Sequence, residues 1–443
     1  MAQRSNTPEE HRNSAKLPPR DYMPAVCAVN GELEANTTND PSFSNKTSIK
    51  EFVYSEEDLI LAEPLSEGGG CSGTETKPPS RFDITLQTGW LEKMALGFFR
   101  YNLGELETRI LPGDFKFIAQ LNIQRGLERR KPQDIQSIQQ RFDPHQFNFN
   151  KIQHEEVLFQ ITKQPVRVEP HLNLEFKIQE CKKTDQGERW PTSRNACGSA
   201  EVRVALSKAW KCSGVWAVIN VSPLEFGHVL FIPDPALCLP QILTADLIQF
   251  GIESVLLSAQ RGFRVGFNSL GGFASVNHLH LHGFYLDHKL FIESASTEPL
   301  CPEKNFHLLS HFPARAFLFY TNGHTLEELA RIIQKVTDCL VAKNIAHNLF
   351  VTRGCAPWNP VNPQFNTGIR IFIWARKSSF GAKEETAFNV ALCELAGHLP
   401  IKNQEDFSTI TEASAVTIVQ QYLLPEDEFS KLTTELVKLL SEE

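Results

Sequence analysis

The sequence predicts an α+β fold, because short strand-like runs and amphipathic helical segments alternate irregularly along most of the chain. Residues 229–232 are apolar and are followed by Pro233 and Asp234, as a buried strand is before a turn. Residues 244–260 instead repeat apolar side chains at helical spacing, behind a threonine that is suited to an N-cap. Strand hairpins with helices packed on them are the architecture that this mixture favours.

Several other segments are assigned in the same way. Further strands are expected at residues 216–221, 263–267, 274–286, 315–320, 346–352 and 368–374, and further helices at 326–340 and 425–440. In the last helix, Phe429, Leu432, Leu436 and Leu439 are expected to share one buried face. The chain has no strong internal sequence repeat, although its two parts follow a comparable strand–helix–strand order.

Composition divides the chain into three parts. Residues 1–51 are rich in Ser, Thr, Asn, Pro and Glu and are expected to form a disordered tail, since they bury too little to offset their ordering entropy. Glycine and proline at 66–70 and 77–80 indicate a linker or loop. Residues 52–295 are expected to form a catalytic half, and residues 296–443 a second α+β half that completes the site.

Charge and composition restrict the partners. The net charge of −8 argues against nucleic acid or an anionic membrane, because neither polyanion is attracted to an acidic surface. No run approaches the roughly 18 to 20 apolar residues that a membrane span requires. The polar N-terminus has no signal-peptide core, and the ten cysteines are scattered without a C-x-x-C pair. A cytoplasmic protein without a cofactor is therefore expected.

His278, His280 and His282 alternate with two leucines. In a β-strand, residues two apart face the same way, so the three imidazoles would share one face while Leu279 and Leu281 point into a core. Two other interpretations exist for the histidines, namely unrelated surface positions and a zinc site. No cysteine or carboxylate is obviously placed to complete a zinc site, so no metal is expected.

The catalytic interpretation makes the central His280 a nucleophile. A neutral imidazole is available near neutral pH, where a lysine amine is mostly protonated. It would attack phosphorus and form a covalent nucleotidyl-histidine, while the flanking His278 and His282 stabilise the charge on the phosphoryl group. A sugar 1-phosphate is a good leaving group here, because its second pKa is about 6.

Two segments around these histidines resemble the histidine triad superfamily. Residues 267–282 end in its alternating histidine pattern, and residues 220–230 are similar to its P-x-x-x-G-H strand turn. Wider blocks at 98–101, 110–113, 117–122, 129–133, 142–144, 147–149, 376–381 and 393–398 are similar to the animal GDP-D-glucose phosphorylase family, which is related to plant GDP-L-galactose phosphorylases and to galactose-1-phosphate uridylyltransferase. This resemblance covers roughly residues 52 to 440.

The resemblance implies a histidine-triad-like, uridylyltransferase-like antiparallel sheet with packed helices, in two related halves. It also implies that GDP-D-glucose and inorganic phosphate react to give GDP and D-glucose 1-phosphate through a guanylyl group on His280. The chain departs from the superfamily's hydrolases at Ala274, where they carry glutamine. It departs from the plant relatives and the uridylyltransferase at His282, where those usually carry glutamine.

Substrate-binding candidates flank the histidines. They are Asn220, Asn268, Gly271, Gly272 and Ser275 near the two motifs, and Arg376, Lys377 and Ser378 after an apolar strand, where cations beside hydroxyls suit an anion. Turn chemistry alone explains the asparagines and glycines equally well. The cluster of Arg125, Arg129, Arg130 and Lys131 is more typical of a solvated loop than of an anion site, and Trp374, His228 and His398 are expected to be structural.

Two other functions remain open on these residues. One is a triad-type hydrolase of nucleotide diphospho-sugars, in which water replaces phosphate. The other is a non-catalytic guanine-nucleotide-binding protein that has kept the fold. The presence of all three histidines favours an enzyme.

Overall fold

The computed structural model describes residues 49–61, 78–130, 132–164, 214–358, 368–380 and 387–442. Nearly all of the expected N-terminal tail and most of the expected 66–80 linker therefore lie outside the described residues. The described chain is α+β, as expected. None of its described helices is long and apolar enough to cross a bilayer.

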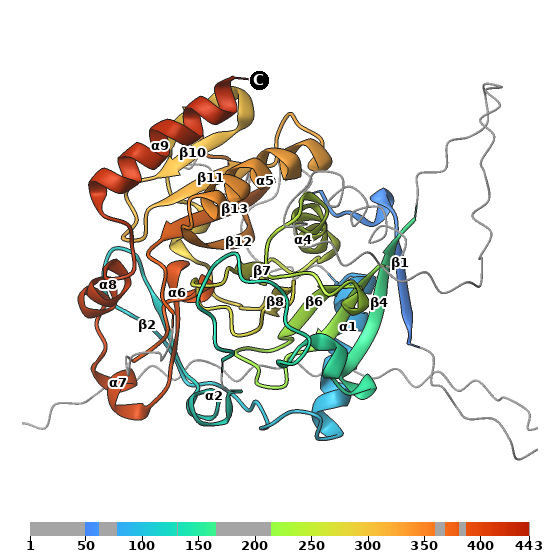
Figure 1. The fold of residues 1–443 in the computed structure, drawn as a ribbon. Coiled ribbons are helices and arrows are strands. Elements are labelled where there is room, and N and C mark those ends of the chain that lie inside the picture. Colours follow the sequence, from blue (N-terminus) through green and yellow to red (C-terminus); the bar gives the residue numbers. More distant parts are fainter. Residues whose placement is uncertain are drawn as a thin grey trace, which may run out of the picture. The chain divides into compact units, whose positions relative to one another are not determined.

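Within the described residues, eleven strands form one large sheet (Figure 1). In sheet order they are β1 (Glu51–Tyr54), β4 (Val157–Lys163), β5 (Val215–Ile219), β6 (Val229–Pro233), β8 (Leu281–Tyr285), β7 (Phe263–Asn268), β12 (Ala346–Gly354), β13 (Gly368–Arg376), β11 (Ala316–Tyr320), β10 (Phe306–Leu309) and β9 (Glu298–Cys301). All neighbours pair antiparallel except β1 and β4, which are parallel. A smaller sheet contains β14 (His398–Ile401), β3 (Ile118–Leu121) and β2 (Thr108–Ile110).

The described helices follow clear start signals. They are α1 (Arg81–Ala95), α2 (Ile123–Glu128), α4 (Ala245–Leu257), α5 (Leu326–Ala342), α6 (Leu392–Leu395), α7 (Gln404–Thr409), α8 (Glu412–Gln420) and α9 (Glu426–Ser441). The Thr244 side chain accepts the amide of Leu247, which confirms the expected N-cap of α4. Thr325 caps α5 in the same way. Short 3-10 segments occur at Glu56–Asp58, Phe149–Lys151, His154–Glu156, Pro235–Leu237, Phe291–Glu293 and Pro302–Lys304.

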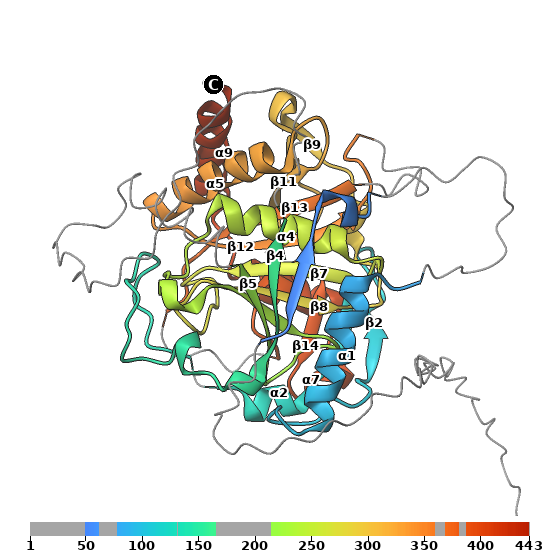
Figure 2. The same ribbon diagram turned by 90° about the vertical axis from the view of Figure 1, so that its right-hand side faces the viewer.

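The order of strands shows that the sheet contains two similar units. The first runs β5, β6, α4, β7, β8 along the chain, and the second runs β10, β11, α5, β12, β13. In the sheet the first unit lies in the order β5-β6-β8-β7, and the second continues as β12-β13-β11-β10. Counted inward from β5 and from β10, equivalent strands therefore follow in the same order. Figure 2 shows α4 and α5, the equivalent helices, lying next to each other over the sheet. The two halves expected from the sequence are therefore visible in the topology.

The two faces of the sheet are covered differently. One face packs against α1, α4, α5 and α9 and includes the side chains of Leu281 and Tyr285. The other face packs against the small sheet and α6–α8 and includes Phe284, Phe350 and Trp374. Because side chains alternate along β8, His282 projects on this second face, with the small sheet and α6.

Two details of the expected elements are wrong. The strand expected at 274–286 begins only at Leu281, because residues 275–278 form a bend in which the Asn277 side chain donates to the carbonyls of Gln140 and Arg141. In α9 the fourth buried residue is Leu440 and not Leu439, whose side chain is 38% exposed. The remaining expected strands and helices are present, with ends shifted by a few residues.

A buried carboxylate joins α1 to the strand that carries His282. Asp83 is fully buried and accepts hydrogen bonds from the Ser258 hydroxyl at 2.6 Å, the Ala259 amide at 2.8 Å and the Tyr285 hydroxyl at 2.9 Å. It also closes the capping box of α1 by accepting from Ser80. The Asp83 carboxylate therefore accepts hydrogen bonds from three parts of the chain. Removing it should destabilise the fold, because several buried donors would lose their partner at once.

We expect Asp83→Ala to lower the free energy of unfolding by about 3 kcal/mol, because the buried donors on Ser258, Ala259 and Tyr285 would be left unpaired. Urea denaturation followed by tryptophan fluorescence measures this. Glu92→Ala, at an exposed position of the same helix, is the matched control and should stay within about 0.5 kcal/mol. Equal losses in the two variants would contradict the buried network.

Candidate active site

His280 is held as one tautomer. Its Nδ1 lies 2.7 Å from the backbone carbonyl of His278, and a carbonyl only accepts, so Nδ1 carries the proton. The neutral ring then has its lone pair on Nε2. Burial lowers the pKa of His280 to about 4, against a smaller opposing effect of the His278 carbonyl. At neutral pH the residue therefore presents an unprotonated Nε2 with a fixed orientation.

The backbone around His280 is clamped by one buried side chain. The Gln241 Oε1 accepts the amide of His280 at 3.0 Å, and its Nε2 donates to the carbonyls of His280 at 3.2 Å and Asn268 at 3.0 Å. The Gln241 amide in turn donates to Oδ1 of Asn277. These bonds replace the strand ladder that is missing before Leu281, and they fix where the imidazole points.

His282 is oriented by a second histidine. The Leu224 amide donates to Nδ1 of His228, so the neutral His228 ring carries its proton on Nε2. That nitrogen lies 3.0 Å from Nδ1 of His282 and donates to it, which leaves the proton of His282 on its own Nε2. The pKa of both rings is lowered well below 6.5, mainly by burial and to a smaller extent by neighbouring arginines and imidazoles. His282 is therefore a neutral donor at the site.

His278 lies in the bend before β8, with its ring among aromatic side chains. Its Nδ1 accepts the amide of Phe149 at 3.1 Å, and its ring lies between Phe142 and Phe149 at centroid distances of 5.0 and 5.2 Å. The expectation that the three imidazoles share one face of a strand is wrong, because only His282 lies in β8, whereas His278 and His280 come before it. Among the described residues, no cluster of three or more side chains suits a metal ion.

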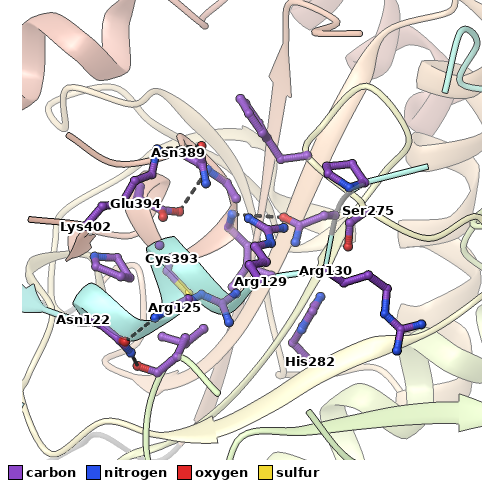
Figure 3. Close-up of a pocket in the computed structure, with 18 of the residues that line it drawn as sticks. Asn122, Arg125, Arg129, Arg130, Ser275, His282, Asn389, Cys393, Glu394 and Lys402 are labelled. Atoms are coloured by element: carbon purple, nitrogen blue, oxygen red, sulfur yellow. Dashed lines mark hydrogen bonds between the residues drawn. The ribbon is translucent and has the colours of Figure 1, made fainter. Parts of the chain in front are cut away.

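Two pockets share His282 in their linings, and Figure 3 shows the larger of the two. The larger has a volume of about 600 Å³ and opens between α2, the 273–275 turn and the 389–406 segment. The smaller one contains His280 and is walled mainly by apolar side chains from Phe147, Phe149, Ile152, Val218, Leu230 and Val276. Arg125, Arg129, Arg130, Ser275 and His282 line both. A ligand with a polar and an apolar end can therefore span the junction beside His280.

Three arginines make the junction strongly cationic. Arg125, Arg129 and Arg130 come from α2 and the residues just after it, and no described carboxylate lies within ion-pair distance of any of them. Burial and then the nearby charge of Arg125 lower the pKa of Arg129 to about 10, so it stays charged at neutral pH. Adjacent guanidinium groups without counterions are an arrangement that suits a phosphate or diphosphate.

The larger pocket also offers groups that suit hydroxyls. Asn389, Glu394, Lys402, Asn403 and Asp406 line its far side, and Figure 3 shows Asn389, Glu394 and Lys402 together around the cavity. One oxygen of Glu394 accepts the Ala391 amide at 2.9 Å. Burial raises the pKa of this carboxyl, and its backbone hydrogen bonds and the arginines oppose the rise.

Both halves of the chain match models of one family, described as GDPGP1-like. Its N-terminal domain matches residues 81–184 and 179–284, and its C-terminal domain matches residues 291–443. The chain belongs to this family.

Named relatives agree with that assignment. The GDP-D-glucose phosphorylase 1 of Xenopus laevis is 56% identical over 395 residues, which are 89% of this chain and 96% of that protein. The Homo sapiens protein of the same name is 46% identical over 401 residues, 90% and 94% of the two chains. GDP-L-galactose phosphorylase 2 of Arabidopsis thaliana is 30% identical over a stretch that covers 82% of this chain and 77% of that protein. The crystal structure of yeast Ap4A phosphorylase Apa2 with Ap4A covers 78% of this chain and 98% of its own, at 13% identity and a TM-score of 0.44, a likeness too distant to bear on function.

Some expected binding residues lie at the pockets. Asn220 lines the smaller pocket with its side-chain nitrogen 3.2 Å from Nε2 of His228, and Ser275 lines both pockets. Asn268 lines the larger pocket, where its Oδ1 accepts from the Asn348 side chain at 2.6 Å and the Leu392 amide at 3.1 Å. Asn268 therefore also ties the triad half to the C-terminal half.

Other expected binding residues are placed elsewhere. Gly271, Gly272, Arg376, Lys377 and Ser378 line neither pocket. Arg376 is fully buried and donates to the Val390 carbonyl while lying 4.9 Å from the Phe273 ring, so it supports the pocket wall from behind. Lys377 bonds the Gln421 carbonyl. Gly271 has a φ of +71°, which explains that glycine as turn chemistry.

The sequence interpretation missed other residues of the site. The basic cluster was assigned to a solvated loop, yet three of its arginines line the pockets. His228 was expected to be structural, and it orients His282. Gln241 and the 389–406 segment carried no signal that spacing rules detect. Trp374 is a core residue, as expected, with its ring nitrogen donating to the Ala314 carbonyl.

The histidines predict a pH dependence of stability. The pKa values of His228, His278, His280, His282, His347 and His398 are all lowered, chiefly by burial. The unfolded chain therefore binds more protons than the folded one between about pH 6.5 and 4, so stability rises with pH in that window. We expect the free energy of unfolding to be level above pH 7. It should fall below pH 6.5 by up to about 1.4 kcal/mol per pH unit for each histidine.

Urea unfolding at a series of pH values tests this expectation. In His280→Asn the fall should be shallower, because one group that protonates only on unfolding has been removed. A free energy that stays constant from pH 7 to pH 5 would show that these imidazoles are not held neutral by burial.

Proposed function

We propose that the chain catalyses phosphorolysis of GDP-D-glucose to GDP and D-glucose 1-phosphate through a guanylyl group on His280. The observation that carries this proposal is the fixed tautomer of His280, whose Nε2 lone pair opens into a pocket beside three arginines. The names of relatives that are 46% to 56% identical along most of both chains support the substrate and the phosphorolytic reaction.

In the first half-reaction, Nε2 of His280 attacks the α-phosphorus of GDP-D-glucose. The N–P bond forms as the bond to the bridging oxygen breaks, and that oxygen leaves with the electron pair as part of D-glucose 1-phosphate. The Nδ1 proton stays in place, and its bond to the His278 carbonyl stabilises the positive charge that the ring acquires. The leaving phosphate needs little protonation, because its second pKa is about 6.

In the second half-reaction, an oxygen of inorganic phosphate attacks the same phosphorus. The N–P bond breaks, its electron pair returns to Nε2 and GDP leaves. The Nε2–H of His282 and the arginines are positioned to stabilise the non-bridging oxygens in both steps. No proton is gained or lost by His280 over the cycle.

We assign the nucleoside to the smaller pocket and the hexose phosphate to the larger one. The apolar walls of the smaller pocket suit a base, and His280 lies in it. The arginines at the junction suit the diphosphate, and the amides and carboxylates at 389–406 suit sugar hydroxyls. In this arrangement residues 52–295 supply the nucleophile and residues 296–443 complete the site, within a histidine-triad-like fold.

The reaction is proposed to run in the cytoplasm, with GDP-D-glucose and inorganic phosphate as partners and without nucleic acid, membrane or cofactor. The acidic net charge of −8 and the scattered cysteines support this setting. The triad-type hydrolase and the non-catalytic nucleotide-binding protein are the alternatives. The names of the relatives that are 46% to 56% identical favour phosphate over water as the acceptor.

We expect His280→Asn to lose the covalent adduct and to reduce kcat by about 10³-fold or more, because asparagine lacks the nucleophilic nitrogen. Mass spectrometry after mixing with GDP-D-glucose in the absence of phosphate detects the adduct in the unchanged protein. His311→Asn, at an exposed histidine that lines neither pocket, is the control and should keep full activity. An adduct in His280→Asn would remove His280 from its role. GMP release at full rate without phosphate would favour the hydrolase instead.

We expect Arg129→Met to reduce kcat/KM for both GDP-D-glucose and phosphate by about 10- to 100-fold, because one charge-assisted contact to the phosphoryl groups is lost. Steady-state rates with either substrate varied measure this. Arg331→Met, at an exposed position of α5, changes charge equally and should have no effect. If both variants fell alike, general electrostatics would explain the result and not a contact at the site.

A further inference from the structure

One carboxylate stands out in the apolar pocket assigned to the base. Glu156 lines the smaller pocket together with Phe147, Phe149 and Ile152, and it is the acidic residue in that lining. It ends the 3-10 segment His154–Glu156, immediately before β4. No described cation lies within ion-pair distance of it. A half-buried carboxylate beside an apolar surface, with no ion-pair partner, retains hydrogen-bonding capacity for a ligand.

Within the described residues, the hydrogen bonding of Glu156 leaves Oε2 free and a second lone pair available on Oε1. Its Oε1 accepts the backbone amide of Gln153 at 3.1 Å, which closes the short helical turn. Neither oxygen accepts another hydrogen bond from the described residues, and a carboxylate has about four lone-pair sites. The Arg130 guanidinium interacts electrostatically with this carboxylate, and it lies over the Phe147 ring, 3.3 Å from its centroid. Arg130 is therefore held by the aromatic wall.

We propose that Glu156 is the residue that selects guanine, by accepting the N1–H and the 2-amino group of the base in the smaller pocket. The proposal rests on the proposed function, which places a nucleoside in this pocket. It adds a determinant of base specificity that no sequence motif indicates.

The donor and acceptor pattern of the bases explains the selection. Guanine presents two neighbouring donors on one edge, and a carboxylate accepts both in a bidentate arrangement. Adenine presents a lone pair at N1 next to its amino group, so a carboxylate would face that lone pair. Uracil has one N–H between two carbonyls, which repel a second carboxylate oxygen. A half-buried carboxylate acceptor therefore favours guanine and penalises the other two bases.

A purely structural role for Glu156 makes a different prediction. If it only caps the 3-10 turn, Oε1 is sufficient, and Glu156→Gln keeps that acceptor and should change neither stability nor base preference. If it binds guanine, Glu156→Gln removes the charge and turns a donor toward N1–H. Glu155 provides a matched control, because it is an exposed glutamate on the same turn that lines neither pocket.

The test compares GDP with inosine diphosphate, which lacks only the 2-amino group, by calorimetric titration of the full chain. The unchanged protein should bind GDP about 10-fold or more tightly than inosine diphosphate. Glu156→Gln should weaken the binding of GDP by about 10- to 100-fold and that of inosine diphosphate by less, so that the ratio of the two affinities approaches one. Glu156→Asp, which withdraws the charge by one methylene, should lower the ratio too. Glu155→Gln should leave both affinities unchanged.

Turnover separates this inference from the proposed function. With GDP-D-glucose and phosphate, Glu156→Gln should raise KM and leave kcat within a few-fold, since the base does not change position at the reacting phosphorus. A GDP preference that persists in both Glu156 variants would overturn the role of Glu156 even if the enzyme is a phosphorylase. Absence of phosphorolysis by the unchanged protein would overturn the proposed function, while the two affinities would still report on Glu156.

Discussion

The hydrogen bond from Nδ1 of His280 to the carbonyl of His278 is the interaction on which the site depends. It determines which nitrogen of the buried ring is free, and it is available only because residues 275–278 bend away from the strand that follows. His278 holds that bend from the other side, since its ring accepts the Phe149 amide and packs between two phenylalanines. The first histidine of the pattern therefore acts on the second through its backbone carbonyl, while its own ring is buried against Phe142 and Phe149.

The same bend connects the two halves of the sheet. Gln241 holds the backbone of His280 and Asn268 together, and Oδ1 of Asn268 accepts from Asn348 in β12 and from the amide of Leu392 in α6. His280 is thus connected, through Gln241 and Asn268, to the segment that carries Glu394 and Lys402. A site built across two units in this way needs both of them, which explains why the three histidines alone do not make a complete pocket.

Sequence reasoning located the chemistry better than its surroundings. The two-residue alternation of side chains along a strand correctly predicted that Leu279 and Leu281 lie in the core and that His282 lies opposite Leu281, because side chains alternate along β8. It failed for His278, since side-chain bonds of Asn277 to a loop 136 and 137 residues earlier compete with the strand. Likewise, the sequence around Arg129 does not indicate whether its side chain lines a pocket or lies on a solvated loop. Arg376 showed the reverse error, because a basic residue after an apolar strand proved to be an internal support of the wall.

Burial serves the site in two opposite ways. It lowers the pKa of His280, His282 and His228, which keeps all three rings neutral and gives each a single defined tautomer. It also lowers the pKa of Arg129 only to about 10, so that Arg129 stays charged at neutral pH, and no described carboxylate lies within ion-pair distance of it. The space beside this guanidinium is therefore open to an anionic ligand. Neutral imidazoles beside unpaired guanidinium groups are unfavourable in an empty pocket, and a bound diphosphate relieves that cost. The arrangement therefore gains most from a ligand that carries its negative charge next to Nε2 of His280, which is where a nucleotide sugar carries it.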